Sequence, residues 1–101
     1  MYSRVTQLEI DTLRMGVDEA LELFRNEVVP VMREQEGYDG AYVLATPDGK
    51  AVLISFWETE EQAHETPFYS AAIAEWMTLF RAPPGHESYE VRFADAPVAA
   101  A

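Results

Sequence analysis

The residues best suited to chemistry gather where a predicted strand passes into a predicted helix, between Ser55 and His64. Trp57 could line a pocket and stack on an aromatic ligand, because Ala51 and Ser55 are small neighbours on the same strand face that leave room for one. An indole that only fills a core needs the same small neighbours. The sequence therefore predicts a small-molecule pocket beside Trp57, and a purely structural tryptophan that sets the spacing between sheet and helix is the alternative.

Two histidines are the next candidates. His64 follows Glu60 by four residues and Glu61 by three, a spacing on one helix face that could seat a metal ion or tune a general base. A solvated helix face has the same pattern, and a di-metal site would require a second Glu-x-x-His and further carboxylates, which the sequence lacks. We therefore expect no metal, and we expect His86 to be an exposed loop residue.

Aromatic side chains on a second helical stretch complete the candidate set. An apolar stripe at helical spacing predicts a core-facing side that includes Tyr69, Trp76 and Phe80. Buried phenol and indole groups normally find a polar partner, so Tyr69 or Trp76 could still donate a hydrogen bond into a cavity. The predicted ligand-binding residues are Ser55, Trp57, His64, Tyr69 and Trp76, and no catalytic residue is assigned. Motifs of nucleotide-binding loops, serine hydrolases and zinc proteases do not occur in the sequence.

Composition excludes several classes of function. The chain of 101 residues has 18 acidic and seven basic side chains, a formal net charge of -11 that would repel nucleic acid and anionic membranes. The absence of cysteine excludes disulfides, thiolate nucleophiles and cysteine-ligated metals. No apolar run is long enough to span a bilayer, and the N-terminus does not have the pattern of a secretory signal, so we expect a cytosolic protein.

The elements that position these residues begin with a strand and a helix. Alternation over residues 2–10 predicts the first strand, and apolar residues at three- and four-residue steps from Val17 predict a helix. Pro30 has no amide hydrogen and its ring crowds the preceding turn, which predicts a kink. Gly37 is expected to end the helix as its C-cap.

A hairpin within residues 36–62 is the centre of the predicted fold. Two apolar strands are joined at Thr46-Pro47-Asp48-Gly49, where Pro47 presets φ and Gly49 supplies positive φ. The return strand ends at Trp57, and Thr59 and Gln62 have the spacing of a capping box that starts the second helix.

The remaining elements are a divided helix, a strand and a tail. Thr66 and Pro67 have the pattern of a fresh N-cap, which predicts a second helix in two pieces. The helix ends at Pro83-Pro84-Gly85, and alternation predicts a fourth strand over residues 88–94. We expect a single domain over residues 1–95 and a flexible tail over residues 96–101.

This βαββαβ order predicts an α+β, ferredoxin-like fold: a four-stranded antiparallel sheet with two helices on one face. Both faces of the central hairpin are apolar, although two helices can cover only one of them. An exposed patch of this size is unusual for a monomer. We therefore expect a homodimer through the second face, which would close the two sheets toward a barrel.

The chain resembles the antibiotic-biosynthesis-monooxygenase-like family of dimeric α+β barrels over about residues 2–95. The resemblance lies in three motifs: Val28-Val29-Pro30, Gly37-Tyr38-x-Gly40-Ala41, and the run from Ser55 to Ala63. Members of this family include cofactor-independent oxygenases that act on polycyclic phenols and haem-degrading oxygenases, and many others have no assigned activity.

The haem-degrading members imply an asparagine on the first strand, a tryptophan on the third and an iron-ligating histidine on the second helix. Trp57 matches the tryptophan, but Thr6 and Gln7 stand on the first strand. Thr66, Pro67 and Phe68 occupy the region of the histidine, and His64 comes about one turn too early. These departures disfavour haem. The resemblance then implies a monooxygenase without metal or flavin that acts on an aromatic or polycyclic small molecule, and the alternative is a non-catalytic module that binds a small molecule or only dimerises.

Overall fold

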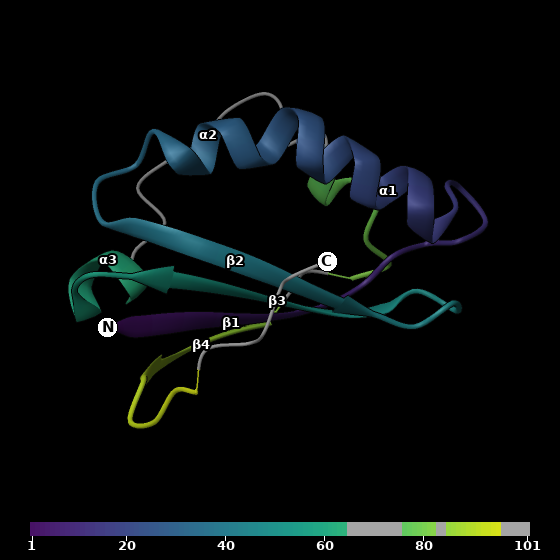
Figure 1. Cartoon of the computed structure of the whole chain (residues 1–101). Coiled ribbons are helices and arrows are strands. Elements are labelled where there is room, and N and C mark those ends of the chain that lie inside the picture. The colour runs from purple at the N-terminus through teal and green to yellow at the C-terminus, as the bar shows by residue number, and fades with distance from the viewer. Residues whose placement is uncertain (65–75, 83–84, 96–101) are drawn as a thin grey trace.

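A computed structural model describes residues 1–64, 76–82 and 85–95. Its elements, in chain order, are β1 (Tyr2–Glu9), α1 (Val17–Leu23), a π-helical turn η1 (Phe24–Val28), α2 (Val29–Arg33), β2 (Tyr38–Ala45), β3 (Lys50–Trp57), α3 (Glu60–His64) and β4 (Gly85–Glu90). The strands form one antiparallel sheet in the order β2-β3-β1-β4, and the helical segment from α1 to α2 lies over one face of it (Figure 1). The ferredoxin-like α+β fold is confirmed.

Some expectations fall outside the described residues. They are the N-cap at Thr66 and Pro67, the side chain of Tyr69, the helix stop at Pro83 and Pro84, and the tail over residues 96–101. Within the described part, no helix is long and apolar enough to cross a membrane. The cytosolic location and the domain boundary at residue 95 stay predictions.

Pro30 interrupts the first helix, as predicted, and the interruption takes the form of η1. The amide of Val29 donates to the carbonyl of Phe24, five residues back, instead of four. Pro30 follows directly and has no amide to offer, so the chain widens by one residue before α2 resumes the α-helical pattern.

The expected C-cap at Gly37 is wrong, because α2 already ends at Arg33 with Glu34 as its cap. The amides of Glu34 and Gln35 bond to carbonyls three residues back and tighten the last turn. Gly37 has a φ of 81° and turns the chain into β2. A Cβ at this position would lie 1.8 Å from the end of the Gln62 side chain, so a larger residue would displace that side chain.

The hairpin turn and the capping box are confirmed. The Thr46 amide donates to the Lys50 carbonyl at 2.8 Å, and Gly49 has a φ of 100°. The Gly49 carbonyl also accepts the amide of Ile10 at 2.8 Å, and a Cβ on Gly49 would lie 2.5 Å from the Ile10 oxygen. At the start of α3, Thr59 and Gln62 exchange side-chain to backbone hydrogen bonds of 3.2 and 3.1 Å.

The fourth strand lies earlier in the chain than predicted, over Gly85–Glu90 instead of residues 88–94. It pairs with β1 from Gln7 back to Tyr2, and the amide of Val91 makes one more bond, to the Met1 carbonyl. The strand ends at Glu90, although the apolar alternation continues to Phe93. His86 is therefore a strand residue, and the expectation of a loop is wrong.

The two faces of the sheet differ in what covers them. We call the face beneath the helical segment the inner face and the opposite one the outer face. The inner face contributes Leu8 and Ala51 to a core that also contains Phe24, Met32 and Trp76. The outer face carries alternate residues of the same strands, and its large apolar side chains are Val5, Tyr42, Leu44, Val52, Ile54, Phe56 and Tyr89.

Candidate functional site

One part of the inner face is polar, and it lies over β3, β1 and β4. The register places Arg4 of β1 opposite Ser55 of β3 on one side and Ser88 of β4 on the other. One row further along, Thr6 lies opposite His86. Side chains that share a row on one face of a sheet lie side by side. We call these five residues the polar cluster.

Trp57 and Ser55 lie at the β3 side of this cluster. Both are almost fully buried, with 2% and 3% of their surface exposed, and the indole N–H donates to the serine hydroxyl at 2.9 Å. The ring of Tyr38 packs edge-on against the indole, with centroids 5.5 Å apart. The predicted pair of Ser55 and Trp57 is thus brought together on the inner face and held in one orientation, as a wall for a flat ligand requires.

His86 forms the opposite end of the cluster. Its Nδ1 lies 3.0 Å from the Thr6 hydroxyl across the β1–β4 ladder. Desolvation of the ring, and then the positive charge of Arg4, lower the pKa of His86 below its usual value of 6.5. The imidazole is therefore neutral at pH 7. When Nδ1 donates to Thr6, the Nε2 lone pair can accept a proton, which is what a general base needs.

His64 reaches the cluster from α3. Its Nδ1 lies 2.9 Å from the Ser88 hydroxyl, and its carbonyl accepts from the Arg4 guanidinium at 3.5 Å. The side chain is exposed and is bonded to the sheet instead of to Glu60 or Glu61. No group of three or more metal-binding side chains occurs among the residues that the structure describes.

Trp76 lies elsewhere, in the core beneath the helical segment. It is 4% exposed, and its indole N–H donates to the Ala20 carbonyl at 3.1 Å. Phe24 and Phe80 pack against its ring, each with centroids 4.8 Å away. These contacts favour a structural role, whereas the predicted role in ligand binding stays untested.

Sequence reasoning did not find Arg4, Thr6, His86 and Ser88 as site residues. Each is an isolated polar residue in an alternating strand, and only the pairing of β1 with β4 places them together. The one available signal was the parity of β1, which puts Arg4 and Thr6 on the same face as the buried Leu8.

The groups of this arrangement suit a molecule that carries negative charge. Arg4 supplies a permanent positive charge, the Thr6 hydroxyl can donate when it accepts from Nδ1 of His86, and His86 supplies a neutral base beside them. The Ser88 hydroxyl donates to the Ala63 carbonyl at 3.4 Å, and Trp57 is 2% exposed.

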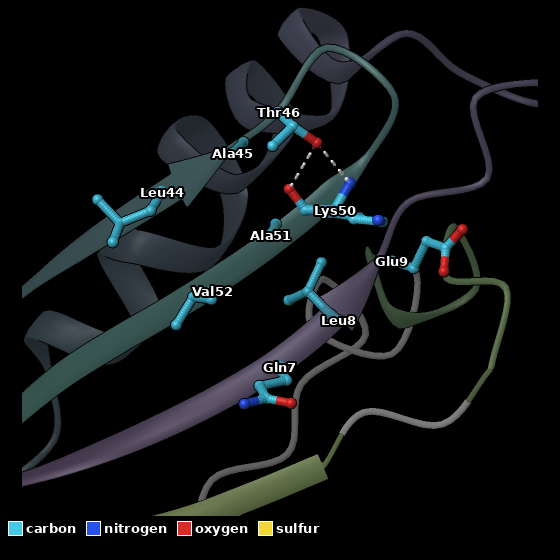
Figure 2. Close-up of a pocket in the computed structure, with 9 residues that line it drawn as sticks. All are labelled: Gln7, Leu8, Glu9, Leu44, Ala45, Thr46, Lys50, Ala51 and Val52. Carbon is cyan, nitrogen blue, oxygen red and sulfur yellow. Dashed lines mark hydrogen bonds between the residues drawn. The ribbon is translucent and has the colours of Figure 1, made fainter.

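A separate open groove of about 480 Å³ lies at the hairpin end of the sheet. Figure 2 shows side chains from β2, β3 and β1 around it, among them the outer-face residues Leu44, Val52 and Gln7. Thr46 of the hairpin turn bonds to the Lys50 backbone at its edge. The lining also includes Leu8, Ala45 and Ala51, and it includes none of the residues of the polar cluster.

Comparisons with known proteins agree with this fold. The chain is similar to a monooxygenase from the gene ActVA-Orf6 of Streptomyces coelicolor, solved in complex with nanaomycin D, with 25% identity over 96% of this chain and 92% of that one and a TM-score of 0.66. It shares its fold with SnoaB, a cofactor-independent oxygenase from Streptomyces nogalater, at 15% identity over 92% of this chain and 94% of that one, with a TM-score of 0.70.

A third similar structure is NE2512, a protein of unknown function from Nitrosomonas europaea, at 25% identity over 97% of this chain and 95% of that one, with a TM-score of 0.65. The search of curated proteins finds no match. The model of the antibiotic biosynthesis monooxygenase family matches residues 1–78. Since this match covers more than half of the 101 residues, the chain belongs to the antibiotic biosynthesis monooxygenase family.

Proposed function

We propose that the protein is a cofactor-independent monooxygenase that acts on an aromatic or polycyclic small molecule with an acidic C–H or phenolic O–H group. The observation that carries the proposal is the polar cluster, where a neutral imidazole, three hydroxyls and a guanidinium share one face beside a buried tryptophan. Family membership and the similarity to ActVA-Orf6 and SnoaB support the same reaction class.

The reaction can be written for an anthrone, a tricyclic ketone with an activated CH₂ group. His86 accepts one C–H proton, and Arg4 with the Thr6 hydroxyl stabilises the resulting enolate oxygen. The carbanion transfers an electron to O₂ and bonds to it at the same carbon, and the resulting peroxide anion takes back the proton from His86 to form a hydroperoxide. Loss of water, which removes the second hydrogen, leaves a carbonyl group. One oxygen atom enters the product and the other leaves as water, so the substrate supplies all the electrons.

The test is oxidation of anthrone with and without protein, in air and under anaerobic conditions. We expect protein-dependent formation of anthraquinone, one O₂ consumed per quinone formed, and one ¹⁸O atom from ¹⁸O₂ in the product. The same slow conversion with and without protein would contradict a monooxygenase for this substrate class. A rise in melting temperature with the anthrone but no turnover would instead support the alternative, a non-catalytic binding module.

We further propose that the outer face forms the homodimer interface. Tyr42, Leu44 and Tyr89 are 43%, 57% and 51% exposed. This is a large area of apolar surface to leave in contact with water for a chain of this size. The groove of Figure 2 continues this apolar surface at the hairpin end. A second copy presents the same complementary face, so a two-fold dimer buries both at once.

A further inference from the structure

A second groove, of about 620 Å³, lies between the helical segment and β2, at the opposite edge of the sheet from the β4 end of the polar cluster. The helical residues Phe24, Arg25, Val29 and Arg33 line one side, and β2 lines the other from Tyr38 to Val43. β2 is the edge strand of the sheet, so the groove is open to solvent along its length.

The charge of this groove is opposite to that of the chain. The chain has a net charge of -11 and only seven basic residues, yet two of them, Arg25 and Arg33, line the groove. Asp39 also lines it, which leaves a net charge of +1 from these three side chains. Among the described residues, neither arginine has a salt-bridge partner. A guanidinium group suits the oxygens of a carboxylate or phosphate.

The π-helical turn aligns these two arginines. Eight residues separate them, and in an unbroken α-helix of 3.6 residues per turn they would be offset by roughly 80° around the axis. The turn η1 absorbs about one extra residue, which reduces the offset to roughly 20°. Arg25 and Arg33 therefore occupy the same side of the helical segment, and Val29 lies between them at the groove.

The floor of the groove is apolar. Phe24 is buried, Val29 and Val43 are partly buried, and all three pack on or within the core. Tyr38 is half-buried, and this burial raises the pKa of its phenol, while the charge of Arg33 acts in the opposite direction. The phenol is thus protonated at pH 7 and can donate a hydrogen bond.

We propose that this groove binds a small aromatic carboxylate, with the carboxylate on Arg25 and Arg33 and the ring against Phe24, Val29 and Val43. The proposal is independent of the monooxygenase activity, because it uses none of the residues of the polar cluster.

Calorimetric titration with 2-naphthoate tests the proposal, with 2-naphthylmethanol as the uncharged probe of the same shape. We expect the double variant Arg25→Gln/Arg33→Gln to weaken 2-naphthoate binding about tenfold or more, since charged hydrogen bonds are lost. The uncharged probe should bind the native protein about as weakly as the variant binds 2-naphthoate. Arg92→Gln removes an exposed arginine at the far end of β4 and should leave binding unchanged.

The two tryptophans locate the bound probe. Tyr38 packs against Trp57 and Phe24 against Trp76, so a ring in the groove should shift both indole N–H signals in NMR spectra. Three results would overturn the proposal: no detectable binding of 2-naphthoate, affinity that the double variant leaves within about twofold, or binding that is lost in His86→Gln but kept in the double variant. The last result would place the probe at the polar cluster instead.

Discussion

The two faces of the sheet reverse the usual distribution of side chains. The inner face, which the helices cover, carries the buried polar residues Thr6 and Ser55 beside its apolar core. The outer face, which the chain itself leaves uncovered, carries Tyr42 and Leu44 in water. A chain selected for stability alone would exchange them, because buried polar groups and exposed apolar ones both cost free energy. The two proposals, a ligand at the inner face and a second copy on the outer face, would account for this reversal.

The largest effect should come from the inner face. His86→Gln keeps a hydrogen-bonding side chain but cannot take up a proton, so we expect anthrone turnover to fall about 100-fold, a typical loss for a general base. The residue is exposed and outside the core, so the melting temperature should stay within a few degrees. Arg92→Gln is the control. Equal loss of activity and stability would show that His86 is structural and would remove the distinction between the faces.

On the outer face, Ile54→Lys should dissociate the proposed dimer. A lysine at the centre of an apolar interface must be desolvated, so we expect a loss of at least about 2 kcal/mol, roughly a 30-fold weaker dimer. Sedimentation velocity over a range of concentrations measures this. Glu19→Gln changes the net charge equally at an exposed site on α1 and should leave the dimer intact. A native protein that sediments as a monomer at micromolar concentration would refute the interface.

Two buried serines, one on each face, allow a matched comparison of stability. Ser55→Ala on the inner face removes the 2.9 Å bond from the Trp57 indole, and we expect a loss of about 1 kcal/mol in the free energy of unfolding. Ser3→Ala on the outer face removes a 3.4 Å bond to the Tyr89 carbonyl, which is too long to contribute much. Urea denaturation of both variants checks the order. A larger loss for Ser3→Ala would contradict it.

The smallest effect should be a pH dependence of stability. The pKa of His86 is lowered in the folded state, so between that pKa and 6.5 the unfolded chain binds more protons than the folded one. The contribution of His86 to the free energy of unfolding is therefore fully present above pH 6.5, and it is lost as the pH falls through the pKa of the folded state. Plots of melting temperature against pH should differ in slope over this range between the native protein and His86→Gln. Parallel curves would mean that the pKa is not lowered.

The pKa of His86 should also determine how the rate of anthrone turnover depends on pH. Since the base must be neutral, anthrone turnover should fall below the folded pKa of His86, at a pH lower than 6.5.

Local sequence patterns were sufficient for much of the fold. Turn chemistry at Gly49 and the capping box at Thr59 and Gln62 involve residues within a few positions of one another, and both were predicted correctly. The π-helical turn was predicted only as a kink, because the missing amide of Pro30 shows that a bond is lost but not how the chain rearranges around it.

The site was predicted only in part, because it depends on long-range pairing. Ser55 and Trp57 are two residues apart on one strand, so their common face follows from alternation alone. His86 joins Thr6 only through a register that spans 80 residues, and the start of β4 was misplaced because apolar alternation begins at Tyr89. The position of β4 follows from its register with β1, and no local pattern in residues 85–90 records that register.

The bond between Gly49 and Ile10 has a consequence for how this chain can change. The tip of the hairpin and the exit from β1 touch backbone to backbone, and a Cβ on Gly49 would enter the space of the Ile10 oxygen. A loop tip normally tolerates inserted residues, but an insertion here would displace Ile10, which is fully buried. The lengths of these two loops should therefore covary among homologues, and a peptide tag would be better placed in another loop than at this one.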